Sequence, residues 1–140
     1  MSSPVLTVQN LAVSFQRTEK GQQLVSDVVC DVDLELHAGE TVALVGESGS
    51  GKSLTALSIL QLLPYPHAFH PRGSIIYQGT EMVDADTETL QRIRGNDMSM
   101  IFQEPMTALN PLHVIEKQIG ESLALHQGIT GNEARENIIT

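Results

Sequence analysis

Gly46-Glu47-Ser48-Gly49-Ser50-Gly51-Lys52-Ser53 is the stretch that decides the fold, and the apolar run Thr41-Val42-Ala43-Leu44-Val45 comes directly before it. The stretch fits the pattern of glycine, four residues and Gly-Lys-Ser, which is typical of a phosphate-binding loop between a strand and a helix. Glycine allows backbone conformations that side chains forbid, so successive amides can turn toward one anion. The pattern therefore predicts a strand at 41–45, a phosphate loop at 46–53 and a helix that starts at Lys52.

The residue types in this loop suit a nucleotide with a magnesium ion. Lys52 would reach the outer phosphates as a point charge, and the hydroxyl of Ser53 would hold the metal. The helix dipole would add positive potential at the same place. The predicted nucleotide contacts are Gly46, Glu47, Ser48, Gly49, Ser50, Gly51, Lys52, Ser53 and Leu54. The alternative is a glycine-rich turn that binds no ligand.

Composition narrows the function classes. The chain has 140 residues, 8 basic and 17 acidic, and a formal net charge of −9, which opposes non-specific binding to nucleic acid or an anionic membrane. A single cysteine, Cys30, excludes an internal disulfide and a multi-cysteine metal site. The N-terminus lacks the regions of a signal peptide, and no apolar run is long enough to span a bilayer. These features predict a soluble chain of the cytoplasm.

The N-terminal part has the alternation of antiparallel strands. Apolar residues alternate at 6–8 and 11–15, which predicts two short strands that meet near Asn10, followed by a polar loop at 18–23. Residues 28–36 form a further half-buried strand, in which one parity is apolar and the other mainly acidic. Cys30 lies on the apolar parity, so we expect a small core residue rather than a reactive thiol.

The remainder mixes helices and strands. We expect helices at 53–63, 86–94 and 114–126, strands at 74–77 and 98–102, and a last helix opened by a capping box of Thr130 and Glu133. His67 and His70 favour an exposed loop over a metal site, because no carboxylate or cysteine lies beside them. Only 41–45 and 98–102 suit a parallel core, which needs about five strands. We therefore expect the chain to be the N-terminal portion of a longer protein.

A second motif, Met100-Ile101-Phe102-Gln103-Glu104-Pro105-Met106-Thr107-Ala108-Leu109-Asn110-Pro111, gives the phosphate loop its context. Together the two resemble the ATP-binding subunits of ABC transporters, and more narrowly the peptide and nickel importer group. A still narrower resemblance, to a tandem ATPase group linked with microcin C and peptide uptake, rests on Leu112-His113 and Glu116-Lys117-Gln118.

The resemblance implies ATP and Mg²⁺ as cofactors and adds residues to the site. Phe15 would stack on adenine, although it also continues an apolar parity into the core. Gln103 would touch the magnesium ion or the attacking water and sense the γ-phosphate. The segment Gln103 to Pro111 would contact membrane-spanning permease subunits, and ATP would lie between this domain and a second nucleotide-binding domain.

These features predict an α/β fold of the phosphate-loop, ABC type, with an antiparallel β layer, an incomplete parallel core and the start of a helical region. Residues 1–140 would be the N-terminal part of one nucleotide-binding domain, without the signature motif, the magnesium aspartate, the catalytic glutamate and the switch histidine. The expected function is to energise an importer for peptides or related small solutes from the cytoplasmic face of the inner membrane, with no nucleic-acid partner. The chain alone should hydrolyse ATP poorly or not at all. Two alternatives stay open: a soluble ABC ATPase acting in DNA repair or translation, and a small-molecule kinase.

Overall fold

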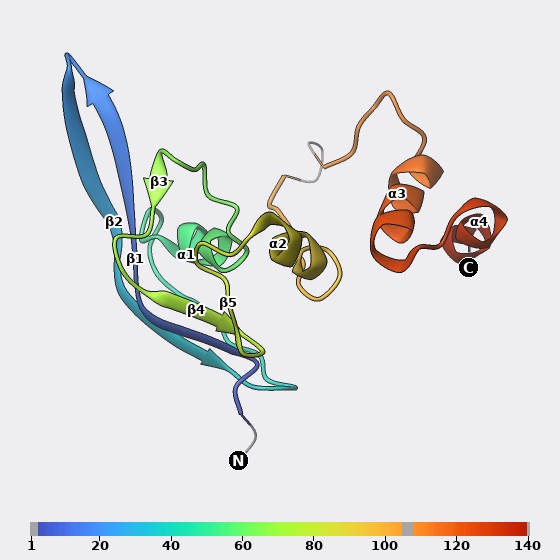
Figure 1. Cartoon of the computed structure of the whole chain (residues 1–140), viewed down its shortest axis with the longest axis horizontal. Helices are drawn as coiled ribbons and strands as arrows, with labels where there is room; N and C mark the ends of the chain where they lie inside the picture. Colours follow the sequence, from blue (N-terminus) through green and yellow to red (C-terminus); the bar gives the residue numbers. More distant parts are fainter. Residues whose placement is uncertain (1–2, 105–107, 140) are drawn as a thin grey trace. The chain divides into compact units, whose positions relative to one another are not determined.

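The computed structural model describes residues 3–104 and 108–139, and the chain divides into two compact units after Leu90 (Figure 1). The first unit contains the sheet and the phosphate-loop segment. The second unit is helical.

The first unit is built on a long antiparallel hairpin. β1 (Leu6–Glu19) pairs along its length with β2 (Gln22–Leu36), and the two are joined by Lys20 and Gly21, whose φ angles are 50° and 79°. β4 (Ser74–Tyr77) pairs with the other edge of β1, and β5 (Thr80–Glu81) pairs with β4. The short strand β3 (Ala68–Phe69) also pairs with β1. All of these pairings are antiparallel, so the predicted antiparallel layer is confirmed, with one continuous strand where two short ones were expected.

An irregularity in the hairpin corrects the predicted burial of Cys30. The register shifts between Val8 and Ser14 of β1, and both Asn10 and Asp31 have positive φ angles, of 48° and 52°. A bulge places neighbouring residues out of simple alternation. As a result Val29 is buried and Cys30 is exposed, so the prediction of a core cysteine is wrong.

Helix α1 (Lys52–Ile59) packs against the hairpin (Figure 1). The buried cluster consists of Val13, Val29, Leu63 and Ala68, and Leu54 and Leu57 of α1 pack against it together with Phe15 and Val32. The predicted helix at 53–63 is therefore confirmed in its first half. It stops at Leu60, and Gln61 has a φ of 53°.

The predicted strand at 41–45 is wrong for this structure. Residues 41–47 have no regular secondary structure, and Val42, Leu44 and Val45 are 41%, 48% and 86% exposed. A parallel strand is stable when neighbouring strands hydrogen-bond to it and layers cover both of its faces. Within residues 3–104 and 108–139, no parallel sheet forms to supply such neighbours.

The second unit begins within α2 (Thr87–Ile93), which confirms the helix predicted at 86–94. The predicted strand at 98–102 is wrong: one isolated parallel bridge joins Arg94 and Met98, while Ile101 is 98% and Phe102 55% exposed. The same lack of neighbouring strands explains this difference.

Two further helices confirm the predictions for the C-terminal part. α3 (Ile115–Gln127) ends at Gly128, whose φ of 69° closes the helix, and α4 (Gly131–Ile139) follows. Gly120 of α3 lies beside Ile138 of α4. Ile115 and Ile119 of α3 are 58% and 42% exposed, so this part of the α3 surface is apolar and solvent-accessible.

Candidate nucleotide-binding site

The predicted phosphate loop is a compact turn at the N-terminus of α1. The backbone N–H of Ser50 donates to the carbonyl of Glu47 at 3.2 Å, and Gly49 and Gly51 have φ angles of 81° and 93°. A Cβ added at Gly46 would lie 2.6 Å from the Oγ of Ser50, so a side chain at this position would displace the Ser50 hydroxyl. The glycines thus stand where the backbone conformation or the close approach requires them.

Lys52 folds back over this turn. Its Nζ donates to the carbonyl of Gly46 at 2.8 Å, to that of Glu47 at 2.7 Å and to the Oγ of Ser50 at 3.3 Å. An ammonium has three donors, so the loop itself receives all of them. The positive charge is thereby held against the loop, where an anion bound by the loop amides would meet it.

The start of α1 is suited to an anion. Gly51 is the N-cap residue, and no side chain caps the helix. The first amides of a helix lack partners within the helix and carry the positive end of its dipole. Ser53 is exposed in this first turn, while Thr55 is buried and its hydroxyl donates to the carbonyl of Gly51 at 3.0 Å. Ser53 is therefore accessible to a metal ion beside the loop.

The loop is fixed to the sheet by a close approach of Gly51 to Val29, which no pattern in the sequence indicated. A Cβ at Gly51 would lie 2.8 Å from Cγ2 of Val29, which is 4% exposed. Val29 therefore sets how closely α1 approaches β2. The simple alternation of apolar residues assigned Val29 to the outer face, and only the bulge brings it inward.

Phe15 lies at the rim of a pocket in the same unit. It is half-buried and packs against the cluster that contains Val29, and it also lines a pocket of about 650 Å³ together with Arg17, Leu24 and His67. Both interpretations of Phe15 are thus compatible with its position: one part of the ring contacts the core and another is accessible. No signal in the sequence pointed to His67 as a neighbour of Phe15.

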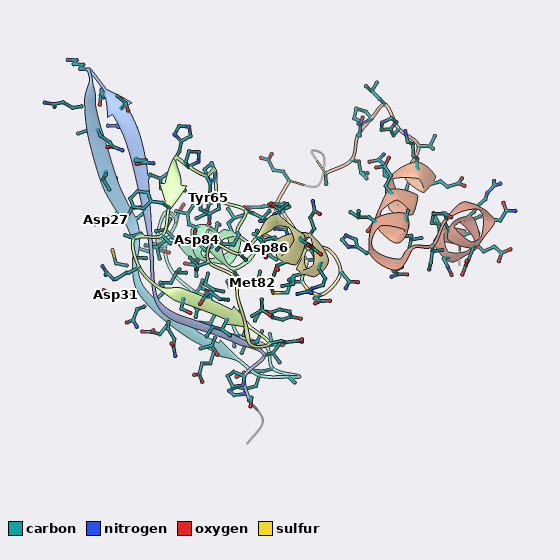
Figure 2. The ribbon with its side chains drawn as sticks, viewed as in Figure 1. Asp27, Asp31, Tyr65, Met82, Asp84 and Asp86 are labelled. Carbon is teal, nitrogen blue, oxygen red and sulfur yellow. The ribbon has the colours of Figure 1, made fainter. Side chains whose placement is uncertain are left out.

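The loop after α1 is tied to β1 by a short hydrogen-bonded chain. The hydroxyl of Tyr65, which is labelled in Figure 2, lies 2.7 Å from Nε2 of His70, and Nδ1 of His70 lies 3.1 Å from the carbonyl of Ala12. These contacts hold the loop that carries His67 against the hairpin.

Gln103 belongs to the second unit, whereas the phosphate loop belongs to the first. Gln103 and Glu104 are exposed, and residues 105–107 of the predicted loop from Gln103 to Pro111 lie outside the described residues. At its far end, Gln118 ties the loop to α3: its Oε1 accepts from the backbone N–H of Asn110 at 2.8 Å, and its Nε2 donates to the carbonyl of Asn110 at 3.0 Å.

In the part of the chain that the structure describes, no three or more His, Cys, Asp or Glu side chains lie close enough together to hold a metal ion by themselves. Magnesium is commonly held by one or two protein ligands together with substrate phosphates and water. The single hydroxyl of Ser53 is compatible with this kind of site, because most of the magnesium ligands would come from a bound nucleotide and water. Among the described residues, every helix is also too short or too polar to cross a membrane.

Comparison with protein families matches residues 29–139 to the family described as ABC transporter. The chain belongs to this family. A solved structure described as a dimeric, post-hydrolysis state of the ATP-binding cassette MJ0796 bound to ADP and Pi has the same fold, with a TM-score of 0.73 at 23% identity. The match covers 96% of this chain and 54% of that structure.

Among curated proteins, the chain is 54% identical to the peptidoglycan transport ATP-binding protein YejF of Agrobacterium fabrum and 51% identical to an uncharacterized ABC transporter ATP-binding protein YejF of Escherichia coli. Each match covers 99% of this chain, but only 24% and 26% of the relative. The oligopeptide transport ATP-binding protein OppD of Bacillus subtilis is 40% identical over 96% of this chain and 37% of its own length. The chain thus spans about a quarter of the length of the first two relatives.

Proposed function

We propose that this chain is the N-terminal part of one nucleotide-binding domain in an ABC importer for peptides or related small solutes. Family membership implies nucleotide binding, and the relatives named for peptidoglycan and oligopeptide transport favour an importer. The observation that carries the proposal is the placement of the Lys52 ammonium against the turn at 46–50, at the uncapped start of α1.

In this proposal the loop binds the phosphates of ATP through its amides and Lys52. The contact of Lys52 with Ser50 Oγ, at 3.3 Å, is longer than the two contacts with carbonyls and is therefore the weakest of the three. A phosphate oxygen can replace it without breaking the bonds to Gly46 and Glu47. Lys52 would then hold the outer phosphates while it remains anchored to the loop.

Mg²⁺ would bind Ser53, with Gln103 as the second predicted protein ligand. The ion would neutralise charge on the terminal phosphates during transfer of the γ-phosphoryl group to water. Gln103 would sense the γ-phosphate, and the segment Gln103 to Pro111 would contact the permease subunits. A second nucleotide-binding domain would cover the other side of the ATP, and the assembly would lie on the cytoplasmic face of the inner membrane.

The alternative of a soluble ABC ATPase acting in DNA repair or translation is less consistent with the net charge of −9 and with the names of the relatives. Affinity purification of the full-length protein from detergent-solubilised membranes separates the two. If the protein is an importer subunit, membrane-spanning subunits will co-purify with it at a fixed stoichiometry, and nuclease treatment will not change that stoichiometry. Recovery with ribosomes or DNA, and without membrane subunits, would refute the importer assignment.

The proposal also predicts how the chain alone behaves. Because the expected signature motif, magnesium aspartate and catalytic glutamate are absent from these 140 residues, it should release phosphate from ATP no faster than the Lys52→Ala variant. Steady-state ATP hydrolysis by the unmodified chain that is lost in Lys52→Ala would contradict the proposal that hydrolysis needs residues outside this chain.

A further inference from the structure

We propose that Arg92, Asn96 and His126 form a binding site for one small oxyanion, a phosphate or a carboxylate group. The site lies within the second unit, in a pocket lined by the end of α2, the turn that follows it and the last turn of α3. It shares no residue with the phosphate loop, so it does not depend on the proposed function.

The pocket is small, and most of the side chains that line it carry hydrogen-bond donors. Its lining residues are Gln91, Arg92, Asn96, Leu125 and His126. The volume of about 280 Å³ lies just below the range of about 300–1,000 Å³ that is typical of small-molecule sites. The pocket therefore suits a single charged group rather than a whole nucleotide.

The basic side chains of this pocket have no acidic partner. The chain has 17 acidic and 8 basic residues, yet within residues 3–104 and 108–139 neither Arg92 nor His126 forms an ion pair. Arg92 is exposed. A guanidinium presents its N–H donors in a planar fork that matches the oxygens of a carboxylate or a phosphate. The fork of Arg92 is thus accessible to an anion from outside the chain.

The imidazole of His126 is held at the pocket by its packing on Gly95. A Cβ added at Gly95 would lie 2.9 Å from Nε2 of His126 and 3.5 Å from Cε1 of the same ring. Gly95 also has a φ of 78°, a conformation that favours glycine. The ring therefore lies on bare backbone, next to the residue that precedes Asn96, and less conformational freedom is lost when an anion binds it.

Asn96 belongs to a turn that backbone hydrogen bonds close. The N–H of Gly95 donates to the carbonyl of Met98 at 2.7 Å. The N–H groups of Asp97 and Met98 both donate to the carbonyl of Ile93 at 3.0 Å. Nδ2 of Asn96 donates to Oδ1 of Asp97 at 2.7 Å, which uses one of the two amide hydrogens and leaves the other for a ligand. Asp97, the acidic residue of this turn, is not among the residues that line the pocket.

The three side chains offer different donors to one anion. Arg92 would bind two of its oxygens through the fork, and Asn96 would add a neutral N–H. His126 has one N–H donor when its ring is neutral and two when it is protonated. Hydrogen bonds between charged partners are roughly twice as strong as neutral ones, so the site should select oxyanions over neutral molecules of similar size.

The test follows NMR signals of the isotope-labelled chain. The backbone amides of Gly95 and Asn96 report on this pocket, and that of Gly49 reports on the phosphate loop. Sodium phosphate, sodium acetate and sodium chloride would be added to separate samples at equal ionic strength and constant pH. We expect the Gly95 and Asn96 signals to shift until saturation with phosphate, acetate or both, and not with chloride. A response to phosphate alone or to acetate alone would identify the group that the site takes.

Variants assign the response to the named side chains. Arg92→Gln should weaken the anion by about tenfold or more, and Arg92→Lys, which keeps the charge without the fork, should weaken it less. Arg92 is exposed, so neither replacement should disturb the fold. His126→Ala should weaken the anion by about threefold to tenfold. Arg135→Gln is the matched control, because it removes an arginine of α4 that does not line this pocket.

The outcomes separate this site from the phosphate loop. Lys52→Ala should remove the response of Gly49 to phosphate and leave the responses of Gly95 and Asn96 unchanged. Loss of the Gly95 response in Lys52→Ala would refute a separate site, because the anion would then be bound at the loop. Shifts that chloride reproduces, or that saturate with neither phosphate nor acetate, would also refute it. So would equal affinity in Arg92→Gln and the unmodified chain.

Discussion

Replacement of Gly51 by alanine tests how the phosphate loop is attached to the sheet. Gly51 has a φ of 93°, and an added Cβ would lie 2.8 Å from Cγ2 of Val29. The left-handed conformation costs a residue with a side chain about 1–2 kcal/mol. Overpacking against a buried neighbour adds about 1–3 kcal/mol, so we expect Gly51→Ala to lower the free energy of unfolding by about 2–5 kcal/mol.

Gly49→Ala is the matched control within the same loop. Gly49 has a φ of 81°, but a Cβ there would meet nothing within 4 Å. Only the conformational cost of about 1–2 kcal/mol applies to it. Urea unfolding, followed by circular dichroism at equal protein concentrations, gives both free energies.

A second change identifies the source of the difference. In the double variant Val29→Ala/Gly51→Ala, the methyl group that the new Cβ would meet is gone, so the combined loss should be smaller than the sum of the single losses by about 1 kcal/mol or more. If Gly51→Ala costs no more than Gly49→Ala, or if the two changes are additive, Val29 does not set the position of α1 and the attachment described above is incorrect.

Three further predictions concern other parts of the first unit. Phe15→Ala should weaken the binding of ATP by about tenfold or more. Phe15→Leu keeps the packing against the core, so it should lower the affinity for ATP but change the stability in urea little. Equal ATP binding by Phe15→Leu and the unmodified chain would favour a purely structural role for Phe15. Burial opposes the charge of Glu81, but hydrogen bonds from Ser74 Oγ and from the backbone N–H groups of Ile75 and Val83 outweigh it and lower the pKa of Glu81 below 4.5. A carboxyl group with a lowered pKa stabilises the fold at pH values above its ordinary pKa, and this contribution is lost as the pH falls below about 4.5 through the folded-state pKa. Glu81→Gln should therefore make the free energy of unfolding fall less steeply as the pH is lowered through this range. An unchanged slope in Glu81→Gln would exclude the effect. Cys30 should react with a thiol reagent as fast in the folded chain as in urea, because it is exposed; strong protection in the folded chain would restore the original prediction of a core cysteine.

Local chemistry made much of the first unit predictable. The alternation of residues 6–15 and 28–36 predicted antiparallel strands, which the structure joins into one long hairpin. The glycine pattern at 46–51 predicted a turn, which the structure forms with positive φ angles at Gly49 and Gly51. The start of α1 followed from the same pattern. Each of these features depends on residues close together in the sequence.

Features that depend on distant partners were not predictable in the same way. An apolar run such as 41–45 or 98–102 shows that a strand is favoured, but the run does not show whether neighbouring strands are present, and neither run is a strand here. The bulge at Asp31 reversed the burial of Val29 and Cys30. It could not be predicted, because the alternation of apolar and polar residues does not show which aspartate adopts a positive φ angle. The pairing of Ala68 with Phe15, which brings His67 to the pocket, joins two segments that share no sequence signal.

The most direct test of the account is binding of a fluorescent ATP analogue to this chain in the presence of magnesium, beside the Lys52→Ala and Lys117→Ala variants. Lys117 lies in α3 of the second unit, so its replacement removes the same charge from a residue outside the loop sequence. We expect micromolar binding that falls at least about tenfold in Lys52→Ala, since hydrogen bonds to charged groups contribute about 1.5–3 kcal/mol, and that persists in Lys117→Ala. Equal binding by all three chains, or binding by none of them, would contradict the claim that residues 46–53 form the phosphate site of this chain.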